Sequence, residues 1–275
     1  MSSQNTSTIK SKHKSPTWKP KIAIITCTHQ RFSVFQHFLR HIDLCHYYFK
    51  PNLFVGGHEE GHRKELEKCR LKTTWVQAEN KPLGKKFNTV LRAAKKCNPD
   101  YVFITGDDDI YNDRFWKQYQ EAANQGFHFI GLLDAFLVDV ETASAKYFPG
   151  YSRERKGETL GAGRMIHKHL LDIFDWELWE NGINSGLDAS MTKTLSHLNY
   201  MSLAIQGLSQ NVIMVDLKSD VNIWSYNNWY GLTRNLEEVS NIFGQPILKD
   251  YGKNINTNYN IQQTCKPAQA IAPIK

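Results

Sequence analysis

Short apolar runs alternate with segments of helical spacing along the first half of the chain. Apolar runs over residues 21–26 and 101–105 predict buried strands, and residues 52–55 and 73–77 predict two further strands. Helical spacing or composition predicts helices over residues 32–46, 63–71 and 86–97, and a further helix that begins near Asn112 or Asp113. Because strands that alternate with helices at this spacing form βαβ units, we expect an α/β fold with a mostly parallel central sheet flanked by helices.

The pattern changes after residue 127. The run HFIGLLDAFLVDV (128–140) predicts two short strands or a hairpin, and a loop rich in glycine and charge follows over residues 150–165. Two further helices are expected over residues 165–174 and 189–198, and a late strand over residues 211–217. We therefore expect a single domain over residues 21–245, with a disordered basic tail before it (1–20) and a polar tail after it (246–275).

Composition narrows the class of protein. No apolar run approaches the roughly 20 residues that cross a bilayer, and the N-terminus lacks the apolar segment of a secretory signal. The 5 cysteines are scattered singly without a CxxC pair, which argues against a disulfide framework and a structural zinc site and predicts a cytoplasmic protein. The formal net charge of +7 favours an anionic partner such as a nucleotide, a nucleic acid or a membrane surface, although a merely basic soluble protein remains an alternative.

Unusual polar segments follow each of the first four predicted strands. They read TCTHQRF (26–32), GGHEEGH (56–62), AENKPLGKKFN (78–88) and GDDD (106–109). In open α/β sheets, ligands bind beyond the carboxyl ends of the strands. One polar strand end is routine, but four in succession predict a binding site.

Asp107, Asp108 and Asp109 are the most informative of these residues. Three adjacent like charges repel one another, so their place directly after a buried strand needs a cause. One interpretation is a solvated turn that also caps the next helix. The other is a site for a hard cation, because oxygen ligands suit Mg²⁺ and Mn²⁺.

The segment HEEGH (58–62) matches the H-E-x-x-H motif of zinc proteases. That motif needs both histidines on one face of a helix, whereas this segment follows a short strand and two glycines and contains Gly61. A loop with two exposed histidines is the better interpretation. A third interpretation places the loop near a bound nucleotide.

Three further segments have both a chemical and a structural interpretation. Lys85 or Lys86, at the start of a helix, could contact a phosphate, or the two could form a solvated pair beside a tight turn. Arg164 in GAGR could pair with a phosphate or a sugar hydroxyl. Asp188 could be a helix cap or a general base that deprotonates an attacking hydroxyl.

The ordered set of these motifs resembles the nucleotide-sugar glycosyltransferases of the GT-A fold. T-x-T-x-x-R, N-K-P-L-G-K-K-x-N, GDDD, GAGR and a late GLDxSM follow one another over residues 21–235, as in short family 2-like members from bacteria and phages. The resemblance implies a Rossmann-like sheet and a divalent cation, Mn²⁺ or Mg²⁺, that bridges the donor diphosphate.

The resemblance also implies a role for each motif. Because Gly106 stands where the family's first Asp is usual, Asp108 and Asp109 are the expected metal ligands, and Asp188 is the expected catalytic base. The expected donor-binding residues are Thr26, Thr28, Arg31, Asn80, Gly84, Lys85, Asn88, Asp107 and Arg164. Gly56, Gly57, His58 and Glu59 replace the usual base-reading Asp, so the nucleobase stays open, with a UDP-sugar as the first expectation. No histidine follows His197, so no late histidine ligand is expected.

These roles predict a metal-dependent, inverting glycosyltransferase. One expected acceptor is a hydroxymethylated base in phage DNA, which the basic charge would favour. The aromatic segment IWSYNNWY (223–230) could stack an extruded base or pack in the core. The alternatives are a cell-surface glycan or lipid-linked acceptor, and a nucleotide-binding module without turnover.

Overall fold

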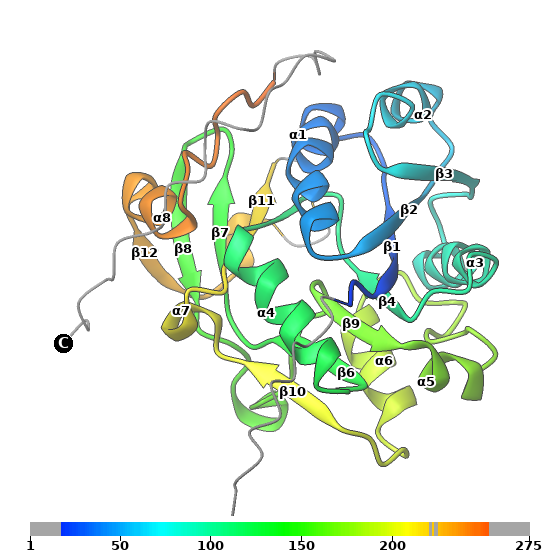
Figure 1. Ribbon diagram of the computed structural model, residues 1–275. Coiled ribbons are helices and arrows are strands. Elements are labelled where there is room, and N and C mark those ends of the chain that lie inside the picture. Colours follow the sequence, from blue (N-terminus) through cyan, green and yellow to red (C-terminus); the bar gives the residue numbers. More distant parts are fainter. Residues whose placement is uncertain (1–17, 220–221, 223–224, 253–275) are drawn as a thin grey trace, which may run out of the picture.

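The computed structural model describes residues 18–219, 222 and 225–252, and it contains two sheets (Figure 1). Within the described residues, the larger sheet has 7 strands in the order β10-β6-β9-β4-β1-β2-β3. Its strands are β1 (Lys21–Cys27), β2 (Lys50–Gly57), β3 (Lys72–Gln77), β4 (Tyr101–Ile104), β6 (Phe129–Leu132), β9 (Arg164–His167) and β10 (Ser202–Ile205). All neighbours pair in parallel except β9, which is antiparallel to β4 and β6. The expected mostly parallel sheet is confirmed.

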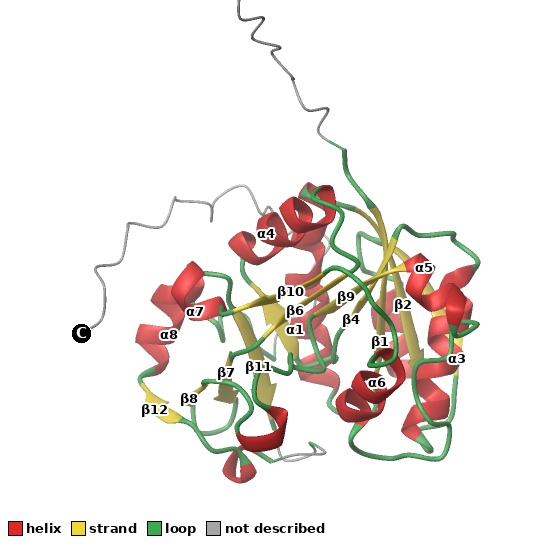
Figure 2. Cartoon of the chain, turned by 90° about the horizontal axis from the view of Figure 1, so that it is seen from below, coloured by secondary structure: helices red, strands yellow, loops and turns green. Residues whose placement is uncertain are grey.

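Helices cover both faces of this sheet, and Figure 2 shows them on either side of the strands. The α-helices are α1 (Phe32–Ile42), α2 (Glu60–Leu66), α3 (Leu83–Lys95), α4 (Asp113–Asn124), α5 (Lys168–Ile173), α6 (Leu187–Leu195), α7 (Gly207–Gln210) and α8 (Leu236–Phe243). Short 3₁₀ turns are η1 (Asp43–Tyr47), η2 (Arg153–Arg155) and η3 (Tyr226–Asn228). Alternate side chains of β1 face opposite layers: Ile22 and Ile24 pack with α1 and α4, whereas Ala23 and Ile25 pack with α3, α5 and α6.

The second sheet continues from the first at the end of β4. Within the described residues it has 5 strands in the order β12-β8-β7-β11-β5. They are β5 (Asp109–Tyr111), β7 (Ala135–Asp139), β8 (Ser144–Phe148), β11 (Met214–Lys218) and β12 (Leu232–Arg234). A separate apolar cluster joins this sheet to α8 and to Val34 of α1. The GDDD segment therefore lies where the two sheets meet.

The structure corrects two expectations about elements and decides between the two alternatives of another. Residues 165–174 do not form one helix, because Met165 belongs to β9 and the helix α5 begins only at Lys168. Residues 128–140 form two strands, but not a hairpin, since β6 pairs with β9 and β10 whereas β7 pairs with β8 and β11. The helix α2 begins at Glu60 rather than at Arg63.

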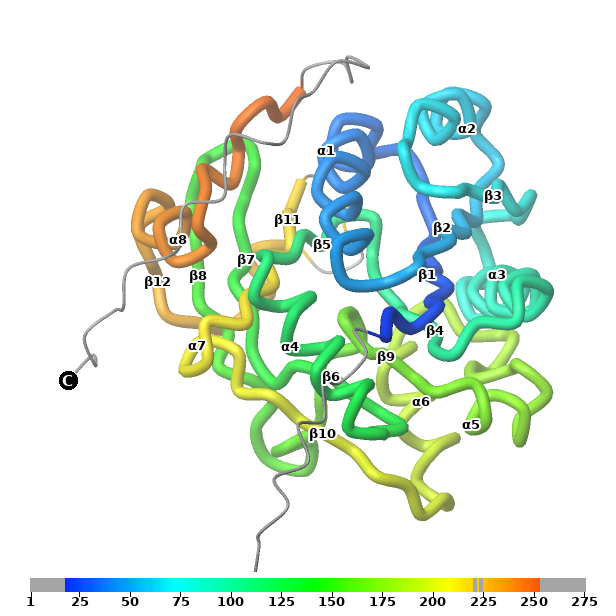
Figure 3. The backbone as a smooth tube through the Cα atoms, in the orientation of Figure 1, coloured from blue at the N-terminus to red at the C-terminus, as the bar shows by residue number. Residues whose placement is uncertain are grey.

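The packed residues continue beyond the expected boundary at residue 246. Ile247 is fully buried, and its carbonyl oxygen lies 2.7 Å from His37 Nε2 of α1. Figure 3 shows this last described stretch, in orange, continuing from α8 towards α1. Residues 246–252 are therefore part of the packed domain, while the rest of the expected tail, residues 253–275, lies outside the described residues, as do residues 1–17.

Candidate functional site

A cavity of about 1130 Å³ lies at the carboxyl ends of β1, β3 and β4. Three of the four polar strand ends line it, from the segments 26–32, 78–88 and 106–109, and the second sheet adds Asp216 and Lys218. The segment after β2, GGHEEGH, is not among the lining residues. The predicted convergence of strand ends is therefore confirmed for three segments.

The cavity contains a compact acidic group formed by Asp108, Asp109 and Asp216. One carboxylate oxygen of each lies within 4.8 Å of the others. Asp109 opens β5, and the antiparallel pairing of β5 with β11 places Asp216 directly opposite it. Like charges opposite each other across a ladder are destabilising, so this pairing has a cost that a bound cation would remove. Asp216 was missing from the sequence prediction.

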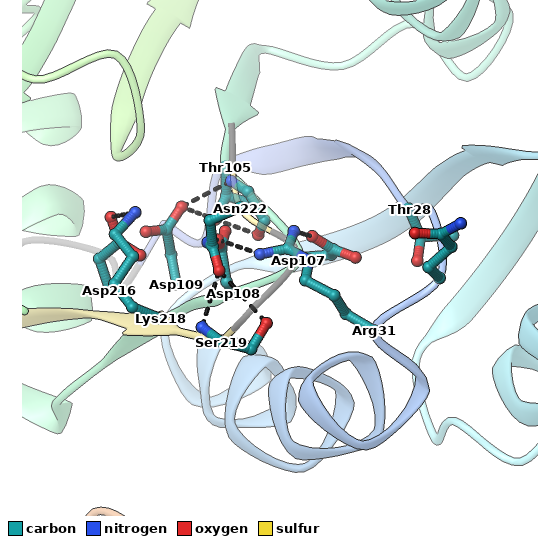
Figure 4. Close-up of polar contacts among 12 residues, drawn as sticks. Thr28, Arg31, Thr105, Asp107, Asp108, Asp109, Asp216, Lys218, Ser219 and Asn222 are labelled. Atoms are coloured by element: carbon teal, nitrogen blue, oxygen red, sulfur yellow. Dashed lines mark hydrogen bonds and ion pairs between the residues drawn. The ribbon is translucent and has the colours of Figure 1, made fainter. Parts of the chain in front are cut away.

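Two cationic side chains contact these carboxylates, as Figure 4 shows. Arg31 Nη1 donates to Asp108 Oδ2 at 2.5 Å, and Arg31 also donates to Asp107. Lys218 Nζ lies 2.6 Å from Asp216 Oδ2. Arg31 and Lys218 thus contact three of the four neighbouring aspartates, counting Asp107, and their two positive charges leave room for the two positive charges of one divalent ion.

The pKa values of these carboxylates reflect their burial first and the neighbouring charges second. Burial raises the pKa of Asp216 to about 6, and burial together with the Asp108 charge raises the pKa of Asp109 well above its usual range. Burial also raises the pKa of Asp107 to about 6, against the opposing charge of Arg31. For Asp108 burial acts in the same direction, but the charges of Arg31 and Lys218 outweigh it and lower the pKa.

The residues present fit a divalent cation. Asp107 Oδ2 and Asp216 Oδ1 are buried and have no hydrogen-bond partner among the described residues. A Cβ atom on Gly106 would lie 2.3 Å from Asp108 Oδ1 and 2.7 Å from Asp109 Oδ2, so only glycine keeps the space between them open. An all-carboxylate set of ligands suits Mg²⁺ or Mn²⁺.

Asp188 lines the same cavity in a different environment. It is the second residue of α6. Tyr151 Oη donates to its Oδ2 at 2.6 Å, and Arg155 Nη2 also donates to this oxygen. Burial opposes ionisation of Asp188, but these two hydrogen bonds outweigh it and lower the pKa. Gly186 is the N-cap residue of α6, so the helix-cap interpretation of Asp188 is wrong.

The lysine that faces the cavity is Lys86 rather than Lys85. Lys86 is 2% exposed, and its Nζ donates to Thr28 O at 2.8 Å and to Asn80 Oδ1 at 3.2 Å. Lys85 is exposed and does not line the cavity. Burial lowers the pKa of Lys86. Thr28, Asn80 and Arg31 all line the cavity with it, in agreement with the expectation for these three.

Four other expected donor-binding residues lie outside the cavity lining and have packing roles. Arg164 is fully buried, and its guanidinium donates to the backbone oxygens of Leu160, Thr159 and Asp188. It therefore fixes the start of α6 instead of facing a phosphate.

The remaining three support α3 and β1. Asn88 Nδ2 donates to Trp179 O at 2.7 Å, and a Cβ on Gly84 would lie only 2.0 Å from Glu180 O, so both hold α3 against the chain before α6. Thr26 is fully buried within β1. These residues support the elements around the site but do not line the cavity.

The HEEGH segment does not form a zinc-protease helix. His58 precedes α2, which starts at Glu60, so His58 and His62 do not share a helical face. His58 is exposed, as expected, but His62 is 4% exposed and therefore buried. The interpretation as a loop with two exposed histidines is thus correct for His58 and wrong for His62.

Solved structures with a similar arrangement exist. S. aureus TarS matches over 82% of this chain at 16% identity with a TM-score of 0.48, and this chain spans 39% of TarS. The inositol-1-phosphate CTP transferase from T. maritima matches over 84% of this chain and 98% of its own, at 11% identity and a TM-score of 0.49. The 4-diphosphocytidyl-2C-methyl-D-erythritol synthase from Anaerococcus prevotii matches over 71% and 92%, at 12% identity and a TM-score of 0.47.

Comparison by sequence adds nothing to these likenesses. No protein-family model matches the chain, and a search of the curated proteins gives no match. Within the described residues, none of the helices has the length and apolar character needed to cross a membrane. Any assignment of function therefore depends on the chemistry of the cavity.

Proposed function

We propose that this protein is a metal-dependent glycosyltransferase that moves a sugar from a nucleotide-sugar donor to an acceptor hydroxyl. The observation that carries the proposal is one cavity lined by two carboxylate sites of opposite character. The acidic group, Asp108, Asp109 and Asp216, has an excess of negative charge, whereas Asp188 is held ionised by hydrogen-bond donors.

The acidic group would bind Mn²⁺ or Mg²⁺ together with the donor diphosphate. When bound, the cation supplies Lewis-acid stabilisation of the charge that develops on the leaving nucleoside diphosphate. Arg31 keeps Asp107 and Asp108 in place, and the buried cation of Lys86 lies on the same cavity, where it would contact a phosphate. A UDP-sugar is the donor that we expect first.

Asp188 would act as the general base. It takes the proton of the acceptor hydroxyl while the acceptor oxygen bonds to the anomeric carbon and the bond from that carbon to the diphosphate oxygen breaks, which inverts the anomeric centre. Its lowered pKa keeps it ionised at neutral pH. Arg155 and Tyr151 orient the carboxylate, and Gly161 lets α6 approach, because a Cβ there would lie 2.8 Å from the Asp188 Cβ.

The acceptor is the open part of the proposal. A hydroxymethylated base in DNA agrees with the net charge of +7, and Trp229 and Tyr230 of the aromatic segment line the cavity, where a base could stack. Trp229 also packs edge-on against Phe148, so part of this segment serves the core, and residues 223 and 224 lie outside the described residues. A cell-surface glycan or lipid-linked acceptor is the competing proposal.

A panel of nucleotide-sugars tests the reaction directly. The full chain would be incubated with each donor in Mn²⁺, Mg²⁺ or EDTA, and the products followed by mass spectrometry. We expect one donor to release its nucleoside diphosphate only when metal is present. Nucleotide binding without release from any donor would favour the non-catalytic module, and release of a sugar 1-phosphate from the donor would indicate nucleotidyl transfer instead.

The same material separates the acceptors. Sugar transfer to duplex DNA that contains hydroxymethylated pyrimidines, with binding that weakens as salt rises, would support the DNA proposal. Transfer to an oligosaccharide or lipid-linked acceptor, with no binding to such DNA at low salt, would replace it.

A further inference from the structure

A second group of metal-binding side chains lies on the loops that follow β1 and β2. His29 comes from the first loop, and His58 and Glu59 come from the second, within the HEEGH segment that the proposed reaction does not use. One ligand atom of each lies within 4.8 Å of the others. We propose that His29, His58 and Glu59 bind a transition-metal ion of the zinc class, at a site separate from the acidic group.

The parallel pairing of β1 and β2 brings the two imidazoles together. Cys27 pairs with Gly56 at the end of the ladder, and Thr28 N donates to Gly56 O at 2.9 Å. His29 lies two residues after Cys27 in the chain, and His58 lies two residues after Gly56. Their ring centroids are 5.5 Å apart. The backbone of the sheet therefore sets the spacing of the two rings.

Glu59 is oriented towards these rings by other contacts. It is the N-cap residue of α2, yet its side chain caps no backbone N–H of that helix. Its two carboxylate oxygens instead accept from Gln30 N, at 2.9 and 3.2 Å, and lie 3.1 Å from His29 Nδ1 and 3.3 Å from His62 Nδ1. Ligating carboxylates are commonly held by such hydrogen bonds from outside the coordination sphere.

In this geometry the HEEGH segment would bind the metal with other residues than the helix of a zinc protease does. His58 and Glu59 are the ligands, and the buried His62 positions Glu59. The third ligand, His29, comes from another loop, so the motif alone could not have indicated the site.

The donor set selects the class of metal. Two imidazoles and one carboxylate suit Zn²⁺, Co²⁺ or Ni²⁺, whereas the all-oxygen acidic group suits Mg²⁺ or Mn²⁺. Ligand atoms around a tetrahedral zinc ion lie about 3.4 Å apart, as follows from zinc–ligand distances of about 2.0–2.1 Å. Rotation of the exposed His58 side chain would close the remaining gap between the ligand atoms.

Zinc binding by the metal-free full chain tests this site. Zn²⁺ would be titrated against a chromogenic chelator in excess Mg²⁺, which occupies the acidic group. We expect uptake of about one equivalent, weakened at least about tenfold by His58→Ala and by Glu59→Gln, since even removal of groups that support a ligand costs that much. His197→Ala and Glu60→Gln are the matched controls, because both side chains are exposed and lie outside the group.

The outcomes separate this site from the proposed glycosyl transfer. Asp216→Asn should leave zinc affinity unchanged, and Co²⁺ should give the visible absorption of a tetrahedral site that His58→Ala removes. Absence of zinc uptake, or uptake that His58→Ala leaves unchanged, would overturn the inference. Zinc uptake lost in Asp216→Asn would place the metal at the acidic group and would overturn it equally.

Discussion

The acidic group and Asp188 line the same cavity, but the surroundings of Asp109 and Asp216 act on their charges in the opposite direction to the surroundings of Asp188. Burial and mutual repulsion raise the pKa of Asp109 and Asp216, while donors from Tyr151 and Arg155 lower the pKa of Asp188. Carboxylates whose environments separate their pKa values usually have different chemical roles. The first group has more carboxylates than Arg31 and Lys218 offset, so it is suited to a cation. The second is ionised at neutral pH and lines the cavity, so it can take a proton from an acceptor hydroxyl there.

Removal of the acidic group should have the largest effect. Asp108→Asn and Asp109→Asn each delete a proposed metal ligand, and the Lewis-acid contribution of a bound cation is several kcal/mol, so we expect losses of roughly 10³-fold or more in kcat/KM. Manganese-dependent binding of UDP, measured by calorimetry, should disappear as well. Asp175→Asn, in an exposed ion pair with Lys95, is the control. Normal manganese-dependent affinity in both variants would refute the metal assignment.

Substitution at Asp188 should separate binding from transfer. Asp188→Asn keeps the shape of the side chain but cannot take a proton, and a missing general base costs about 10²–10⁴-fold in rate. We expect kcat to fall by this amount while the donor dissociation constant stays within about twofold of the wild-type value. A thermal melt checks the fold. Turnover close to wild type would mean that Asp188 only stabilises the start of α6.

The pH dependence of kcat should test the difference in pKa between Asp188 and the acidic group. Arg155→Gln removes a donor that lowers the pKa of Asp188, so the pKa of this carboxylate should rise. The base would then become protonated at a higher pH, and the acid limb of kcat should move upward by about one pH unit, in line with the effect of a neighbouring opposite charge. Lys193→Gln, which removes an exposed ion pair on α6, provides a comparison. An acid limb that does not move would show that another group controls it.

The smallest expected effect is on stability without metal. A raised pKa means that folding disfavours the charged form of Asp109, so the neutral Asp109→Asn should stabilise the metal-free protein at pH 7. We expect a higher Tm for Asp109→Asn than for the wild type in a thermal melt without metal. Asp188→Asn should shift Tm downward, because folding favours the charged form of that residue.

The difference in stability between Asp109→Asn and the wild type should also depend on pH. Because the folded-state pKa of Asp109 is raised, its protonated form contributes stability at low pH, and that contribution is lost as pH rises through the folded-state value. The advantage of Asp109→Asn should therefore shrink as pH falls towards 4. A Tm difference that is independent of pH, or opposite in sign, would contradict the description of the acidic group.

The sequence predicted the sheet well because β1 and β4 are apolar runs that are buried on both faces, while β2 and β3 keep the spacing of a βαβ repeat. It missed the antiparallel strand β9, whose residues Met165 and Ile166 also suit the helix expected there. The sequence also did not show which strands pair with each other. Asp216 joins Asp109 only through the antiparallel pairing of β5 with β11, although an Asp within the apolar run NVIMVDL was a visible anomaly.

Helix phase could have improved the site prediction. Lys86 lies four residues before the buried Val90 on α3, so the helical period places it on the inner face, whereas Lys85 points outward. Arg164 and Asn88 could not be sorted in this way. Their packing roles depend on backbone oxygens of segments that are distant in sequence, Asp188 O for Arg164 and Trp179 O for Asn88.

The most direct test of the two carboxylate sites is a crystal structure with Mn²⁺ and UDP, in which anomalous scattering locates the metal. We expect one manganese peak coordinated by the acidic group and by diphosphate oxygens, with Asp188 free of metal and facing the open part of the cavity. A manganese peak at Asp188, or UDP bound without metal at Asp108, Asp109 and Asp216, would contradict the assignment of roles.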